Sequence, residues 1–168
     1  MSSALNPVLG YVASLHLHPE QSGEAFRKVS SMELVQDKGI VGNPRYFGRR
    51  SRSGGFSKRQ VSLIEREIIS EHAVSLGLEC IPPGVVRSNI ETQGVDLIAL
   101  VGKRVRIGTA VLCFYEPRTP CSKMDEICPG LREMMEKDRQ GVMAQVVQSG
   151  RIAVKDAISL AEDGSAAK

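Results

Sequence analysis

Alternation of apolar and polar residues dominates the chain and predicts short β-strands. In Val8–His18, Leu15 and Leu17 alternate with polar neighbours, which is the two-residue period of a strand with one buried face. Glycine or proline separates most segments of this kind. The expected strands are Val8–His18, Val29–Val35, Arg59–Leu63, Val85–Glu91, Lys103–Ile107, Ala110–Glu116, Val142–Val147 and Ala157–Leu160.

Two segments follow a helical period instead. Between Glu65 and Leu76 the apolar residues recur on one helical face, and the segment ends at Gly77, a common residue at helix C-termini. Leu131–Lys137 carries a shorter apolar stripe. Many strands, two helices and no strand–helix–strand rhythm predict a mainly β protein with a few helices (α+β), in which helices pack outside a β-barrel or sandwich.

Length and composition indicate one globular domain. The chain has 168 residues, of which 42% are hydrophobic, and a formal charge of +3. A chain of this length buries roughly 70% of the surface that it exposes when unfolded. We expect the core to span about residues 8–160 and residues 161–168 to form a flexible tail. No apolar run approaches the roughly 20 residues of a membrane helix, so we expect no membrane span. The N-terminus lacks a signal-peptide pattern and no Cys-x-x-Cys pair occurs, so we expect a cytoplasmic protein.

The segment from Asn43 to Gln60 concentrates positive charge. It lacks acidic residues and contains three of the seven aromatic residues of the chain within a Gly- and Ser-rich sequence. Its basic residues are Arg45, Arg49, Arg50, Arg52, Lys58 and Arg59, and its aromatic residues are Tyr46, Phe47 and Phe56. Forked guanidinium donors and stacking planes suit a planar, anionic ligand. A basic loop without a ligand and a single-stranded nucleic-acid site are open alternatives, although the absence of a second basic stripe argues against nucleic acid.

Cys121 differs from the other cysteines in its surroundings. Cys113 lies in an expected strand and Cys80 near a turn, and we expect both to be structural. Cys121 follows two stiffening prolines, and Arg118 precedes it by three residues. A nearby guanidinium favours the thiolate, so Cys121 is a candidate nucleophile, with an inert thiol as the alternative.

Metal-ligand patterns are weak. Cys128 follows Cys121 after six intervening residues, a spacing open to a resolving disulfide or to shared metal binding. His16 and His18 share one face of an expected strand, and we expect them to be surface residues rather than ligands. A structural zinc site requires tighter pairs of cysteine or histidine.

Eight stretches of the chain form an ordered set of motifs. They are Gly39–Asn43, Arg59–Leu63, Arg87–Asn89, Gly94–Leu97 with Val101–Gly102, Ile107–Ala110, Arg118–Cys121, Arg139–Gly141 and Gly150–Asp156. In this order they resemble the MOSC domain, a module that occurs at the carboxyl end of molybdenum-cofactor sulfurases and as small stand-alone bacterial proteins. The element Arg118-Thr-Pro-Cys121 is the most diagnostic, and the resemblance extends over about residues 8–160.

The resemblance implies a barrel-like fold and a site around Cys121. Cys121 occupies the position of a cysteine that carries sulfur as a persulfide or ligates molybdenum, and Arg118 is its expected catalytic partner. The cofactor implied is molybdenum cofactor (molybdopterin), which purification can remove; pyridoxal phosphate is not expected in this chain. The residues expected to bind the cofactor are Arg45, Tyr46, Arg49, Arg50, Arg59, Arg87 and Asn89.

Three functions follow as hypotheses, and the question of enzymatic activity stays open among them. The first is cofactor binding with sulfur transfer through Cys121, which requires a cysteine desulfurase or another sulfur donor as partner. The second is a molybdenum-dependent reductase of N-hydroxylated substrates, which requires a redox partner. The third is a non-catalytic barrel that binds an anionic small molecule.

One departure from the family pattern concerns the expected pocket. Many members have Gly-Asp followed by His or Arg after the first glycine pair, whereas this chain has Gly42-Asn-Pro-Arg45. The change removes a carboxylate that could orient the pocket.

Overall fold

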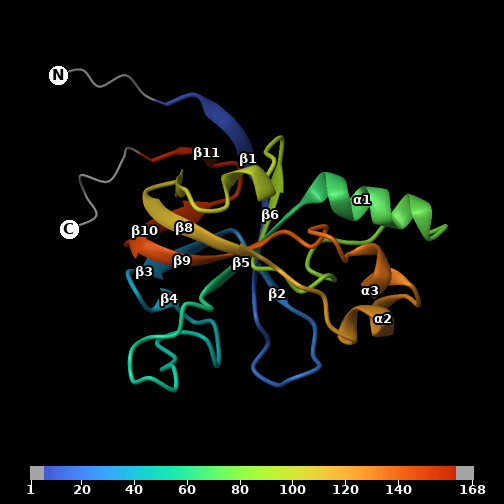
Figure 1. The fold of residues 1–168 in the computed structure, drawn as a ribbon, viewed down its shortest axis with the longest axis horizontal. Coiled ribbons are helices and arrows are strands. Elements are labelled where there is room, and N and C mark those ends of the chain that lie inside the picture. The colour runs from blue at the N-terminus through green and yellow to red at the C-terminus, as the bar shows by residue number, and fades with distance from the viewer. Residues whose placement is uncertain (1–5, 162–168) are drawn as a thin grey trace.

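A computed structural model describes residues 6–161 (Figure 1). The strands are β1 (Val8–Leu17), β2 (Arg27–Val29), β3 (Ser31–Val35), β4 (Gly39–Ile40), β5 (Val61–Glu65), β6 (Ile90–Gln93), β7 (Arg104–Ile107), β8 (Ala110–Pro117), β9 (Val142–Gln148), β10 (Gly150–Ala153) and β11 (Ala157–Leu160). The helices are α1 (Arg66–Ser75), the 3-10 turn η1 (Ile98–Leu100), α2 (Lys123–Ile127) and α3 (Leu131–Met134).

Seven strands close into a barrel. Their order is β11-β7-β8-β9-β5-β6-β1, and pairing of β1 with β11 joins the two ends of the sheet. All these pairs are antiparallel except β5–β6. Strand β2 extends the sheet beside β1, and β10, β3 and β4 form a separate small sheet. The predicted mainly β, barrel-like fold is therefore confirmed.

Two of the expected strands need correction. The segment Val29–Val35 is two strands rather than one, because the chain changes partner around Ser30: β2 pairs with β1, whereas β3 pairs with β10. In the segment Val85–Glu91 only the last two residues are extended. The preceding residues form tight turns in which Arg87 has a positive φ of 65°.

Two apolar clusters stabilise the fold. The larger fills the barrel and includes Leu15, Leu63, Ile90 and Phe114, all fully buried. The smaller lies where α1, α2 and α3 gather at one side of the barrel (Figure 1). The expected helices Glu65–Leu76 and Leu131–Lys137 match α1 and α3, whereas α2 was not expected. None of the helices described has the length and apolar character to span a membrane.

A buried ion pair fixes the segment that connects α1 to β6. Arg66 Nη1 donates to Glu91 Oε1 over 2.9 Å, and Glu91 is fully buried. The second carboxylate oxygen of Glu91 accepts from the backbone N–H of Gly84 over 2.8 Å, and Arg66 also donates to the carbonyl of Ile81. These bonds hold residues 81–91 against the barrel end at which the candidate site lies.

Gly141 allows close contact between β9 and β5. Its φ is 79°, and a Cβ atom there would lie 1.8 Å from the carbonyl oxygen of Leu63. The Gly141 carbonyl also accepts from the backbone N–H of Arg118 over 2.9 Å. A side chain at this position would therefore separate two barrel strands and displace Arg118.

We predict that Gly141→Ala destabilises the protein far more than Gly102→Ala. Both glycines have positive φ, but no atom lies within 4 Å of a Cβ built at Gly102. The Gly102 variant should lose about 1–2 kcal/mol from left-handed strain alone, whereas the Gly141 variant should lose more than about 4 kcal/mol or fail to fold. Urea unfolding measures both. Equal losses would show that the close contact between the strands is unimportant.

Candidate functional site

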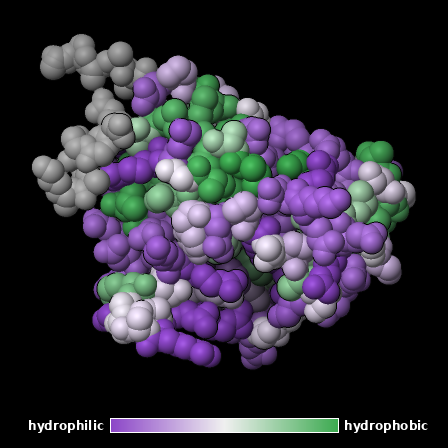
Figure 2. All heavy atoms as spheres, viewed as in Figure 1, coloured by the Kyte–Doolittle hydropathy of each residue, from purple (hydrophilic) through white to green (hydrophobic). Residues whose placement is uncertain are grey.

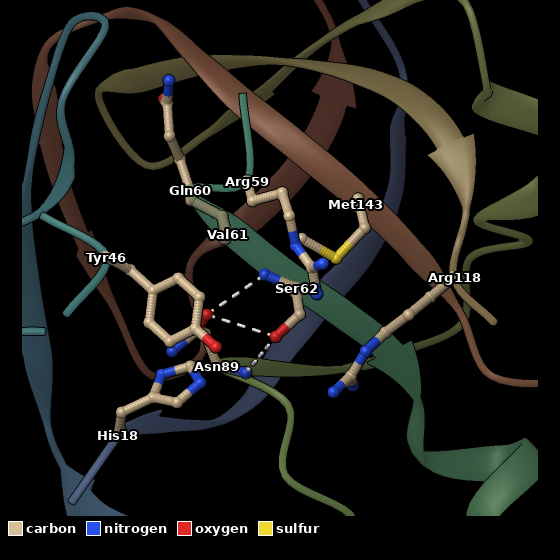
Figure 3. Close-up of a pocket in the computed structure, with 9 residues that line it drawn as sticks. All are labelled: His18, Tyr46, Arg59, Gln60, Val61, Ser62, Asn89, Arg118 and Met143. Carbon is tan, nitrogen blue, oxygen red and sulfur yellow. Dashed lines mark hydrogen bonds between the residues drawn. The ribbon is translucent and has the colours of Figure 1, made fainter. Parts of the chain in front are cut away.

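A small polar pocket opens at one end of the barrel (Figure 3). Its lining comes from the end of β1, the loop before β5, β5 itself, the turn before β6, the end of β8 and β9. The lining residues are His18, Tyr46, Arg59, Gln60, Val61, Ser62, Asn89, Arg118 and Met143. Its cavity volume is about 30 Å³, which suits a few small atoms rather than a complete ring system.

Arg118 is the main cationic group of the pocket. Its Nη1 donates to Ser88 Oγ over 2.8 Å, and its Nη2 donates to the carbonyl of Arg87 over 3.0 Å. Within residues 6–161 it forms no ion pair with a carboxylate. Burial lowers the pKa of Arg118 to about 10, although the nearby Cys121 raises it. The guanidinium therefore remains charged at neutral pH and is available to an anion.

His18 faces this cation across the pocket. Its ring packs between Phe26 and Tyr46, each with a centroid distance of 4.4 Å. Asn43 Oδ1 accepts from the backbone N–H of His18 over 2.8 Å and from its Nδ1 over 2.9 Å. Burial lowers the pKa of His18 to about 4, with a smaller contribution in the same direction from Arg118. The imidazole is therefore neutral at pH 7.

Asn89 lines the pocket but directs its side chain to the protein (Figure 3). Its Oδ1 accepts from the backbone N–H of Ser62 over 3.1 Å and from Ser62 Oγ over 3.2 Å. Its Nδ2 donates to the His16 carbonyl over 3.1 Å. Asn89 thus fixes Ser62 in the pocket wall. This structural contact was not part of the cofactor-binding role expected for Asn89.

Cys121 lies outside the pocket lining, in the exposed segment between β8 and α2. It lies close enough to Arg118 to raise the pKa of that guanidinium, against the larger lowering by burial. All four cysteines are free. Cys80 is also exposed and Cys113 is only partly buried, so exposure does not distinguish Cys121 from Cys80. Cys121 differs from Cys80 in having the Arg118 guanidinium nearby.

The expected binding residues do not all lie together. Tyr46, Arg59 and Asn89 line the pocket with Arg118, the expected catalytic partner, and Arg87 lines a neighbouring cavity of about 270 Å³. Arg45 is exposed, yet its charge also acts on His18.

Arg49 and Arg50 remain within the basic loop. The guanidinium of Arg49 lies 5.8 Å from the Tyr46 ring centroid, and that of Arg50 lies 4.2 Å from the Phe56 centroid. Figure 2 shows mainly hydrophilic residues over the lower half of this face, where the loop lies.

The expectation that His16 lies on the surface is wrong. His16 is only 1% exposed, because the turn around Gly84 covers it and the Ser88 carbonyl lies 3.3 Å from its Nδ1. His18 is partly buried in the pocket rather than displayed to solvent. No cluster of three potential metal-ligating side chains occurs among the residues that the structure describes.

Sequence reasoning assigned no role in the site to His18, Ser62, Gln60 or Met143. The one available indication was the position of His18 at the end of a long strand, directly before a predicted break. The partners of Asn43 and Ser62 are 25 and 27 residues away in the chain, so local patterns do not contain them.

The model of the MOSC domain family matches residues 37–159. YuaD from Bacillus subtilis is similar in structure, with a TM-score of 0.73, 19% identity, and coverage of 89% of this chain and 93% of that one. YiiM from Escherichia coli has a TM-score of 0.66, 17% identity, and coverage of 92% and 71%. No curated protein gives a significant sequence match.

We predict that an oxyanion stabilises the protein through Arg118. Sulfate at about one hundred times its dissociation constant should add about 2.7 kcal/mol to the free energy of unfolding. In Arg118→Gln this increment should be lost, whereas Arg106→Gln on β7, away from the pocket, should retain it. Urea unfolding with and without sulfate, at constant ionic strength, measures the increment. An equal increment in both variants would exclude Arg118 as the anion site.

We also predict that His18 makes the protein less stable in acid. Because the folded-state pKa is lowered to about 4 from the usual 6.5, the unfolded chain binds a proton between these values when the folded chain does not. Stability should therefore fall as pH drops from about 6.5 to about 4. In His18→Phe, which keeps an aromatic ring, the fall should be smaller by about 1–3 kcal/mol.

Urea unfolding at pH values across this range measures the difference. The pKa values of His16 and His72 are also lowered by burial, but both residues are present in the wild type and in the variant. Identical pH profiles would show that His18 is not the group responsible.

Proposed function

Because the chain belongs to the MOSC domain family, we propose that it binds molybdenum cofactor (molybdopterin) and carries sulfur on Cys121 as a persulfide. The observation that carries this proposal is the position of Arg118, a cation without a carboxylate partner in the part of the chain described, which lines the polar pocket and lies near enough to Cys121 for the cysteine to raise its pKa. A guanidinium in this setting suits both an anionic ligand and a thiolate.

The pocket residues fit the anionic part of such a cofactor. Arg118 and Arg59 supply charged donors, whereas the Ser62 hydroxyl already donates to Asn89 Oδ1. Asn43 lies outside the pocket lining, and its buried Nδ2 has no hydrogen-bond partner within the described residues. The bound cofactor would supply a molybdenum centre able to exchange a sulfur ligand or to be ligated by a thiolate.

The neighbouring cavity fits the ring part of the ligand better than the pocket does. Its volume is about 270 Å³, and Phe26, Arg87 and Ile127 contribute to its wall. Phe26 also contacts the His18 ring, so a wall residue of the larger cavity packs against a wall residue of the pocket. An apolar ring plane and a guanidinium beside the smaller polar pocket match a planar group attached to an anion.

Sulfur transfer to Cys121 is a thiol exchange. The Cys121 thiolate attacks the outer sulfur of a persulfide on a donor such as a cysteine desulfurase; a sulfur–sulfur bond forms to Cys121 while the donor's sulfur–sulfur bond breaks, and the donor leaves as a thiolate. The exchange involves no net oxidation. Exposure of Cys121 allows the donor to approach, and Arg118 stabilises negative charge on the sulfur.

We predict that incubation with a cysteine desulfurase and cysteine increases the intact mass by one sulfur, about 32 Da. Cys121→Ser should abolish this adduct, because Cys121 is the exposed thiol beside Arg118. Cys80→Ser is the matched control, since Cys80 is also exposed, and it should retain the adduct. Intact-protein mass spectrometry before and after reduction measures it.

An adduct that persists in Cys121→Ser would contradict the proposal. If the protein retains molybdenum and pterin but Cys121 acquires no sulfur, the carrier role fails. The same cysteine would then be better explained as a metal ligand of a molybdenum-dependent reductase.

A further inference from the structure

We propose that Asn43 and His18 make the pocket selective for an anion that carries a proton, such as the singly protonated form of a phosphomonoester. In this arrangement His18 accepts a hydrogen bond from the ligand through Nε2, while Arg118 and Arg59 pair with its negative oxygens. His18 is then a residue that determines ligand specificity.

The neutral His18 ring carries its proton on Nδ1. Asn43 Oδ1 accepts two hydrogen bonds from His18, one from the backbone and one from ring Nδ1. An amide oxygen has no proton to donate, so Nδ1 must carry the ring proton. The proton-free nitrogen of the neutral ring is therefore Nε2.

The Asn43 side-chain amide has one possible orientation. Its oxygen faces the backbone N–H of His18, which can only donate, so the oxygen must point toward His18. Asn43 is 1% exposed, and its own backbone carbonyl accepts from the N–H groups of Tyr46 and Phe47. The loop thus fixes the backbone of Asn43, and the backbone N–H of His18 fixes the amide oxygen, so the fold determines the tautomer of His18.

The Nε2 atom of His18 faces the pocket. In Figure 3 the His18 ring lies below Tyr46 and turns one edge toward the middle of the pocket. Nε2 is not among the buried atoms without a partner, and it makes no hydrogen bond within residues 6–161. The lone pair is therefore available to a ligand.

Burial and the charges around His18 keep it an acceptor. Burial is the largest cause of its lowered pKa, and Arg118 from the end of β8, Arg45 from the loop after β4 and Arg87 from the turn before β6 act in the same direction. Arg59 also lines the pocket. Tyr46 is the other titratable group in contact with the ring. A divalent cation is disfavoured among these guanidinium groups. An anion with one O–H donor satisfies both the cations and the lone pair.

This inference rests on the proposed function only in naming the cofactor's phosphomonoester as the physiological ligand. Free inorganic phosphate has the same chemistry. Binding can be tested without cofactor, sulfur donor or metal, so its failure is distinguishable from failure of the persulfide assay.

The test compares methyl phosphate with sulfate. At about pH 5 a phosphomonoester, whose second pKa is about 6, is mostly singly protonated, whereas sulfate carries no proton. His18 is still mostly neutral there, since its pKa is about 4. Isothermal titration calorimetry at about pH 5 and about pH 7.5 should show that the wild type prefers methyl phosphate over sulfate at the lower pH.

Two variants isolate the contribution of the lone pair. In His18→Phe the preference for methyl phosphate over sulfate at the lower pH should fall by about tenfold, the loss expected for a hydrogen bond to a charged ligand. In Asn43→Asp the carboxylate should raise the His18 pKa, and the charged ring should then favour sulfate. Nitrogen-15 NMR of the imidazole checks both the tautomer and the pKa. Arg106→Gln is the control and should keep the wild-type preference.

Three results would overturn the proposal. The first is a wild-type protein that binds sulfate as tightly as methyl phosphate at the lower pH, or that binds neither. The second is an unchanged preference in a folded His18→Phe variant. The third is NMR evidence that Nε2 rather than Nδ1 carries the proton at pH 7. A fourth result bears only on the identity of the ligand. If methyl phosphate is preferred but phosphorylated pterin binds no better than inorganic phosphate, the selectivity for a protonated anion stands and the cofactor is not the physiological ligand.

Discussion

The position of Arg118, a cation that forms no ion pair within residues 6–161, organises the site. Transfer of a guanidinium from water into a protein costs several kcal/mol, and its hydrogen bonds to Ser88 and to the Arg87 carbonyl each return about 1.5–3 kcal/mol. These neutral partners offset the cost without cancelling the charge. The backbone of Arg118 is itself held by Gly141. The barrel therefore maintains a positive charge that a carboxylate partner would have neutralised, and this charge is what the pocket and Cys121 share.

Much of the fold could be predicted because its information is local. The two-residue alternation of β1 and the helical period of α1 depend on neighbouring residues alone. The errors arise where distant contacts decide. His16 occupies a position that alternation leaves open to solvent, but the turn around Gly84 covers it after Arg66 and Glu91 have fixed that turn. The break near Ser30 likewise reflects pairing with β10, more than one hundred residues later.

The candidate site was predicted in part. His18 was not assigned to it from the sequence, for a physical reason. Arginine, tyrosine and cysteine can be recognised by residue type within short motifs, and Tyr46, Arg59 and Arg118 do meet in the pocket. The role of His18 depends on Asn43, which lies 25 residues later. In the sequence Asn43 marks a departure from a family pattern that has aspartate. In the structure it still orients the pocket, with a neutral amide that leaves the histidine uncharged where an aspartate would favour its protonation.

The separation of pocket and cysteine has consequences for the chemistry. The pocket is too small for a ring system, and Cys121 stands outside its lining in an exposed segment. One ligand can therefore occupy the pocket with its anionic end while a second protein approaches the sulfur. A cysteine inside the pocket would not allow both at once. Arg118 connects the two places, because charge on the sulfur and charge on a bound anion act on the same guanidinium.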